Sequence, residues 1–187
     1  MIIINEKRKR AASATIFLIF LLSLLSGCVE KSDSDNGEDF EFALLDGTVK
    51  HLSDYRGKIV ILDMWASWCS PCAYQMAELR TAYDTYDRNE LEIISLNIDP
   101  RENNDVINQY VSDYKSQLGV DLDWIFGQDN GSVWAEYMIG QGGIPTLYIF
   151  NQEGIIHFSH EGLTFFSEVP DTFPDSPTLA LKINELI

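Results

Sequence analysis

The sequence predicts an α/β sandwich, in which helices flank a central mixed β-sheet. Two observations lead to this prediction. Apolar runs rich in β-branched residues, which are typical of buried strands, alternate with segments whose apolar side chains recur at helical spacing. The chain then ends in two extended runs around a turn, followed by one helical segment. Strands that alternate with helices in this way form layered α/β domains.

A β-hairpin opens the predicted domain. Residues 40–43 and 48–51 are short extended runs, and Asp46-Gly47 between them is a common hairpin turn. The next strand is predicted at residues 58–65 (KIVILDMW). Its nearly continuous apolar character indicates burial on both faces of the sheet.

Two helices and a second buried strand follow. Residues 71–87 carry apolar side chains at helical spacing, and residues 104–118 are amphipathic in the same way. Between them, residues 91–98 (LEIISLNI) form another apolar run, which predicts a second buried strand.

The C-terminal part of the chain continues the alternation. Residues 124–126 favour a short strand, and residues 132–139 favour a helix that is capped near Asn130. The last helix is expected to begin at Ser176-Pro177, because serine is a good cap and proline suits the first helical position. The hairpin before it consists of residues 146–150 and 155–159.

Composition and charge narrow the class of protein. The chain has 187 residues, of which 45% are hydrophobic, so one domain with a packed core is expected. The formal net charge is −16 at pH 7, which argues against a nucleic-acid partner.

The N-terminal segment is not expected to belong to the folded domain. Residues 7–10 are basic, and the largely apolar residues 11–26 carry no charge, which is the order typical of a signal peptide. The segment ends in LSGC, which resembles the lipobox of prokaryotic lipoproteins and implies that Cys28 carries a lipid after cleavage. The alternative is an uncleaved N-terminal anchor, which would have the same orientation.

These observations predict three regions. Residues 1–27 are a signal peptide with a lipobox, residues 28–39 are a flexible acidic tether, and residues 40–187 are the folded domain. Either interpretation of the N-terminus places the domain outside the cytoplasm and anchors it to a membrane.

A Cys-Ser-Pro-Cys motif lies where the first buried strand gives way to a helix. Unpaired backbone N–H groups and the helix dipole at that position favour the thiolate form of Cys69, which can then attack a disulfide. Cys72 lies one turn inside the helix and can resolve the mixed disulfide. Ser70 and Pro71 are expected to tune the couple, because Pro71 stiffens the turn and neither residue adds a positive charge.

Two other uses of the cysteine pair are disfavoured. A structural disulfide across two residues closes a very small loop and restricts the unfolded chain little. A zinc site would need two more ligands, and the chain offers three histidines and no second cysteine pair. We therefore expect a redox-active disulfide, Cys69–Cys72, with no metal and no other cofactor.

Residues 40–158 resemble the thioredoxin superfamily, in particular its extracytoplasmic TlpA/ResA-like branch. The resemblance is carried by the motifs LSDYRGK, DMWASWCSPC, LNIDP and GGIPTLYIF. It implies a thioredoxin fold with an N-terminal β-hairpin, a TlpA-type insertion at residues 103–130, and thiol–disulfide oxidoreductase activity.

The resemblance also implies roles for individual residues. Cys69 would be the attacking sulfur and Cys72 the resolving one. Asp63 corresponds to a buried carboxylate, whose raised pKa would let it shuttle the proton of Cys72. Pro145 corresponds to the family's cis-proline, beside which the backbone of Ile144 can pair with a substrate strand.

Other positions are less typical of the family. Trp68 flanks the motif and is predicted to contact substrate, although packing would explain it equally well. Gln75 stands where ResA-like members often carry a glutamate, and Ala77 replaces a common helix proline. Residues 163–175 match no known motif.

The predicted function is a membrane-anchored oxidoreductase that reduces disulfides in exported proteins. It would receive electrons from an upstream membrane donor, and cytochrome c maturation is one candidate pathway. The alternative is a Sco-like copper-binding and delivery module on the same fold. Its cysteine pair is usually spaced one residue wider, and its histidine precedes the strand that begins here at Thr146. A peroxiredoxin would want a threonine shortly before its reactive cysteine, and residues 64–68 contain none.

Overall fold

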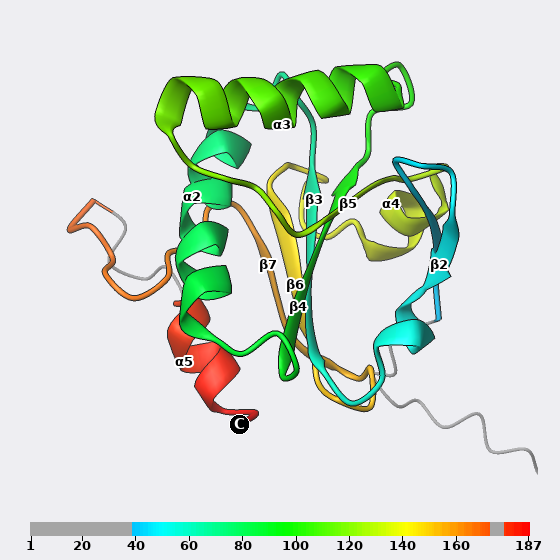
Figure 1. The fold of residues 1–187 in the computed structure, drawn as a ribbon. Coiled ribbons are helices and arrows are strands. Elements are labelled where there is room, and N and C mark those ends of the chain that lie inside the picture. Colours follow the sequence, from blue (N-terminus) through cyan, green and yellow to red (C-terminus); the bar gives the residue numbers. More distant parts are fainter. Residues whose placement is uncertain (1–38, 173–177) are drawn as a thin grey trace, which may run out of the picture. The chain divides into compact units, whose positions relative to one another are not determined.

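The structure is a computed structural model that describes residues 39–172 and 178–187. These residues form one mixed sheet with helices on both faces, as predicted (Figure 1). The predicted signal peptide, the lipobox cysteine Cys28 and nearly all of the tether lie outside the described residues. Within the part of the chain that is described, no helix has the length and apolar character needed to cross a membrane.

The described strands are ordered β2-β1-β5-β4-β3-β6-β7 in the sheet. Their bounds are β1 Glu41–Leu44, β2 Val49–His51, β3 Ile59–Trp65, β4 Leu91–Asn97, β5 Ile125–Gln128, β6 Thr146–Phe150 and β7 Ile156–Glu161. The central strands β3, β4 and β5 are parallel, whereas β6 pairs antiparallel with β3, and β1 pairs antiparallel with β5. The predicted N-terminal hairpin is confirmed as β1 and β2.

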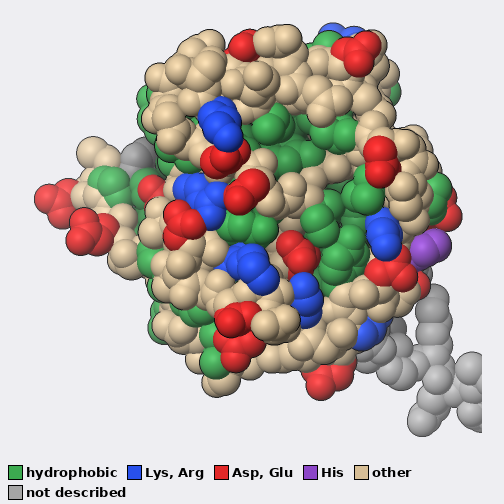
Figure 2. All heavy atoms as spheres, viewed as in Figure 1, with side chains coloured by type: hydrophobic (Ala, Val, Ile, Leu, Met, Phe, Trp, Pro, Cys, Tyr) green, Lys and Arg blue, Asp and Glu red, His purple; other side chains and the backbone are tan. Residues whose placement is uncertain are grey.

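The helices lie on the two faces of this sheet. They are the 3₁₀ helix η1 Leu52–Tyr55 and the α-helices α2 Ser70–Thr85, α3 Asn104–Leu118, α4 Ser132–Tyr137 and α5 Leu179–Asn184. Helices α2, α3 and α5 contribute to one hydrophobic core, and α4 and η1 contribute to the other. In Figure 1, α3 and the start of α2 lie at the same end of the sheet. Acidic and basic side chains are interspersed over the face shown in Figure 2.

Strand β3 contributes side chains to both hydrophobic cores, because all seven of its residues are buried. Ile59, Ile61 and Trp65 pack with the core beneath α2 and α3, whereas Val60, Leu62 and Met64 pack with the opposite core. Since side chains alternate along a strand, Asp63 lies on the same face as Ile61 and Trp65. The one acid of this apolar strand therefore points toward the helix that carries the cysteines.

The predicted boundaries of three helices differ from the structure. Helix α2 covers Ser70–Thr85 instead of residues 71–87. Helix α4 ends at Tyr137 instead of residue 139, and the left-handed backbone of Gly140 (φ +57°) follows shortly after. Helix α5 begins at Leu179 rather than Pro177, which lies outside the described residues. Its cap residue Thr178 is extended because it forms an isolated parallel bridge with Phe165.

Candidate active site

The predicted cysteine pair is joined in a disulfide at the start of α2. Cys69 is the N-cap of the helix, and Cys72 lies inside its first turn, with Cα atoms 5.3 Å apart. The Cys69 sulfur accepts a hydrogen bond from the backbone N–H of Cys72 at 3.2 Å. Cys69 is 5% exposed and Cys72 is fully buried. Of the two cysteines, Cys69 is therefore the one with surface that solvent and a partner can reach.

Asp63 is fully buried on the sheet face beneath this pair. Its Oδ2 accepts a hydrogen bond from the Ser95 hydroxyl at 2.9 Å, and its Oδ1 has no hydrogen-bond partner among the described residues. Burial raises the pKa of Asp63 to about 7, while the hydrogen bond from Ser95 opposes that rise. A carboxyl group with this pKa can accept or release a proton near neutral pH.

The backbone on the other side of Cys69 comes from the loop before β6. The Ile144–Pro145 peptide bond is cis, as the resemblance implied for Pro145. The carbonyl oxygen of Ile144 lies 3.6 Å from the Cys69 sulfur. Thr146 also holds this loop, because its hydroxyl donates a hydrogen bond to the Gly143 carbonyl at 2.6 Å. The structure therefore brings the predicted docking residue Ile144 into contact with the predicted attacking sulfur.

Glu161, at the end of β7, holds the same loop and was not predicted. Its Oε2 accepts hydrogen bonds from the backbone N–H groups of Gln141 and Gly142, at 2.8 and 3.1 Å. A Cβ atom on Gly143 would lie 2.9 Å from the Glu161 carboxylate, so a larger residue there would have to displace that carboxylate. The sequence showed a glycine-rich run before Ile144, but the pairing of Thr146 with Glu161 that brings the carboxylate there depends on strand register.

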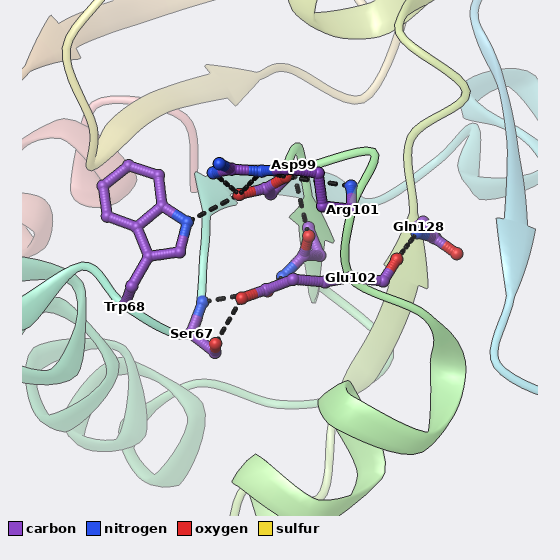
Figure 3. Close-up of polar contacts among 7 residues, drawn as sticks. Ser67, Trp68, Asp99, Arg101, Glu102 and Gln128 are labelled. Carbon is purple, nitrogen blue, oxygen red and sulfur yellow. Dashed lines mark hydrogen bonds and ion pairs between the residues drawn. The ribbon is translucent and has the colours of Figure 1, made fainter.

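Trp68 is held by its indole nitrogen while its ring stays exposed. The indole N–H donates to Asp99 at 2.7 Å, and 59% of the residue's surface is accessible (Figure 3). Hydrogen bonds from Arg101, and to a smaller extent from Trp68, hold the pKa of Asp99 well below its ordinary value. An exposed ring with a fixed orientation, next to Cys69, is suited to contact a bound polypeptide.

Glu102 ties the loop between β3 and α2 to the end of β4. Its carboxylate accepts hydrogen bonds from the backbone N–H and the hydroxyl of Ser67, and from the side-chain amide of Asn97. The amide of Gln128 donates to the Glu102 backbone carbonyl, as Figure 3 shows. These contacts fix the segment that immediately precedes Cys69. No pattern in the sequence predicted this role for Glu102.

Gln75 is a buried connector rather than a titrating group. Its side-chain amide donates to the Thr164 carbonyl at 3.1 Å and accepts from the Thr164 N–H at 2.8 Å. A glutamate could not donate in its ionised form, so the glutamine matches this site. The contacts attach α2 to residues 163–166, a segment for which the sequence suggested no purpose.

Two of the three histidines contact residues other than the cysteines. His157 lies 2.8 Å from the Glu185 carboxylate, and His160 lies opposite Leu147 in the β6–β7 ladder. Among the described residues, no three His, Cys, Asp or Glu side chains are grouped so that they could hold a metal ion.

Comparison with known proteins gives a consistent result. Residues 34–159 match the AhpC/TSA family. The thiol-disulfide oxidoreductase ResA of Geobacillus thermodenitrificans is 27% identical over 159 residues, which cover 80% of this chain and 86% of the relative. ResA of Oceanobacillus iheyensis is 29% identical over 167 residues, which cover 81% of this chain and 82% of the relative.

A solved structure supports the fold. A DsbE-type thiol:disulfide interchange protein from Chlorobium tepidum superposes with a TM-score of 0.62 at 23% identity, over 82% of this chain and 96% of that one. The resemblance to thioredoxin-like, ResA-type proteins is therefore confirmed, and the chain is a thiol–disulfide oxidoreductase. By its match over residues 34–159, the chain belongs to the AhpC/TSA family.

Proposed function

We propose that this protein is anchored to the outer side of a membrane and reduces disulfides in exported proteins through Cys69 and Cys72. The observation that carries the proposal is the placement of the couple. Cys69 caps α2 beside the Ile144 carbonyl, whereas Cys72 is buried on the side of Asp63. This arrangement separates an accessible sulfur from a shielded one, as a two-step exchange requires.

In the first step, the reduced protein attacks a substrate disulfide. A substrate strand aligns along the backbone at Ile144, and the Cys69 thiolate attacks one substrate sulfur. A Cys69–substrate disulfide forms, the substrate disulfide breaks, and the second substrate sulfur leaves with the electron pair. The fixed ring of Trp68 provides an apolar contact for the same substrate.

In the second step, Cys72 resolves the mixed disulfide. Its sulfur attacks Cys69, the Cys69–Cys72 disulfide forms, and the first substrate sulfur leaves as a thiolate. Asp63 accepts the proton that Cys72 loses. This role is supported by the raised pKa of Asp63 and by its Oδ1, which has no hydrogen-bond partner in the described part of the chain. Two electrons have then passed from the protein to the substrate, and a membrane donor must return two electrons to the disulfide.

Trapping tests which proteins are the substrates. A Cys72→Ser variant keeps the attacking sulfur but cannot resolve, so it should accumulate mixed disulfides with its partners in cells. We expect mass spectrometry of the captured proteins to find exported polypeptides. Cytochrome c precursors, whose Cys-x-x-Cys-His haem sites must be reduced, would identify that candidate pathway.

The double variant Cys69→Ser/Cys72→Ser is the control for this trap and should capture nothing. Capture of cytoplasmic proteins alone by Cys72→Ser would refute the proposed location and substrate class.

The anchor is tested at Cys28. Cys28→Ala should release the protein from membranes or leave it as an unprocessed precursor, because the lipobox cysteine is the site of both cleavage and lipid attachment. Membrane fractionation and intact mass measure this result. Ser34→Ala, a nearby change in the tether, should leave the protein on the membrane. A wild-type mature protein that begins after residue 28 and carries no lipid would contradict the anchor.

A further inference from the structure

Asp63 stands at the end of a buried row of three hydrogen-bonded side chains. The Ser95 hydroxyl on β4 lies 2.9 Å from Asp63 Oδ2, and the Trp124 indole nitrogen lies 3.0 Å from the same hydroxyl. Ser95 is fully buried and Trp124 is 7% exposed. The three hydrogen-bonded side chains are therefore shielded from water.

The chemistry of these groups fixes the direction of both hydrogen bonds when Asp63 is ionised, because a carboxylate can only accept. An indole N–H can only donate, so the Ser95 oxygen must accept from Trp124. The hydroxyl proton of Ser95 then points to Asp63, and Asp63 Oδ2 is the acceptor. An oxygen that accepts this bond is a poor place for a second proton. When Asp63 is protonated, its proton is accordingly favoured on Oδ1, which is buried and has no hydrogen-bond partner among the described residues.

Each of these three side chains is held in place by the surrounding structure. Asp63 and Ser95 are register partners in the parallel pairing of β3 and β4, and Phe126 of β5 is the next partner across. Trp124 stacks on Phe126, with ring centroids 5.7 Å apart and planes 22° apart. Its ring also contacts Tyr83 of α2 at a centroid distance of 5.6 Å. These contacts leave the indole N–H little freedom to turn away from Ser95.

We propose that Ser95 and Trp124 are positioning residues that keep Oδ2 of Asp63 as an acceptor and direct its transferable proton to Oδ1. The inference rests on the proposed function, in which Asp63 receives the proton of Cys72. It assigns a role to the residues between α3 and β5, because Trp124 lies in that part of the predicted insertion. The insertion would then contribute to proton transfer as well as to the outer surface.

Removal of the Ser95 hydroxyl should be visible in the titration of Asp63. The bond from Ser95 stabilises the ionised carboxylate, so Ser95→Ala should raise the pKa of Asp63 by about one unit. Trp124→Phe keeps a ring but frees the hydroxyl to turn, and should cause a smaller rise. The double variant should match Ser95→Ala alone, because the indole acts only through the hydroxyl.

The titration is best followed in the full-length oxidised protein by infrared or carbon NMR signals of the carboxyl group, assigned with Asp63→Asn. The disulfide keeps both cysteines from titrating in this state. On α3, Tyr110 interacts electrostatically with Asp63, but burial raises the pKa of Tyr110 to about 12, so it stays neutral in the relevant range. Trp134→Phe, on the opposite face of the sheet, is the matched control and should leave the titration unchanged.

The outcomes separate this inference from the proposed function. A raised Asp63 pKa with an equal upward shift of the pH profile for turnover supports both. A raised Asp63 pKa with an unchanged pH profile supports the positioning role and refutes the proton transfer by Asp63. An unchanged Asp63 pKa in Ser95→Ala, or independent additive shifts from the two single variants, overturns the positioning role whatever the activity.

Discussion

Cys69→Ser is expected to lower the rate at which this protein reduces disulfides to the background of the assay. Cys72→Ser should still attack a substrate disulfide but should not complete the turnover. The reason is the placement of the two sulfurs, one at the cap of α2 and one inside its first turn. Insulin reduction measures the loss, and gel analysis without reductant measures the mixed disulfides that Cys72→Ser retains. Both variants are best compared in a Cys28→Ala background, so that every labelled thiol belongs to the couple.

The assignment of the two sulfurs has a direct check. The reduced protein is alkylated briefly near pH 7, and the labelled peptides are mapped. Cys69 should react first because it is the accessible member of the pair. Faster labelling of Cys72 would reverse the assigned roles.

Asp63→Asn should slow turnover by about 10- to 1,000-fold, which is the range for loss of one positioned acid–base group. Asparagine has nearly the same shape and can still accept the hydrogen bond from Ser95, but it cannot take up a proton. Steady-state reduction of insulin at several pH values measures the effect. A rate equal to that of the wild-type protein would show that Asp63 has only a structural role.

The same substitution should change how stability depends on pH. The pKa of Asp63 is about 7 in the folded protein against 3.8 as its ordinary value, so between these pH values the folded state binds more protons than the unfolded state. The free energy of unfolding therefore falls as the pH rises through this window, and the loss is complete above about pH 7. From the size of the pKa difference, the loss is at most about 4 kcal/mol.

Urea unfolding of the oxidised protein at pH 5 and pH 8 measures this dependence. Asp63→Asn should remove that part of the pH dependence. The quantity to compare is the change in the free energy of unfolding between pH 5 and pH 8, because a buried amide also changes the absolute stability. An equal change in the two proteins would show that Asp63 does not titrate in this window.

The buried parts of the fold were the easiest to predict from the sequence. The apolar runs at residues 58–65 and 91–98 became β3 and β4 within one residue at each end, because a strand buried on both faces needs apolar side chains throughout. The start of the last helix could not be predicted in the same way. Thr178 is extended because it pairs with Phe165, and no local pattern announces a contact between two such segments.

The candidate site shows the same division. Cys69, Asp63 and Pro145 lie in short contiguous motifs, and the resemblance that these motifs carry indicated them. Glu161 and Ser95 reach the site through strand register, which local spacing does not encode. A motif therefore identifies the groups that react, while the groups that hold them become visible only when the sheet is assembled.

The attachment of α2 on two sides has a consequence for recognition. Tyr114 of α3 donates to the Ala73 carbonyl at 2.8 Å, and Gln75 exchanges two hydrogen bonds with Thr164. Both attachments lie within two turns of the couple, and neither involves a sulfur atom. We therefore expect α2 to stay in place when the disulfide opens or closes. In the proposed function, an electron donor and a substrate would then meet nearly the same surface in both oxidation states, and the sulfur atoms themselves would distinguish them.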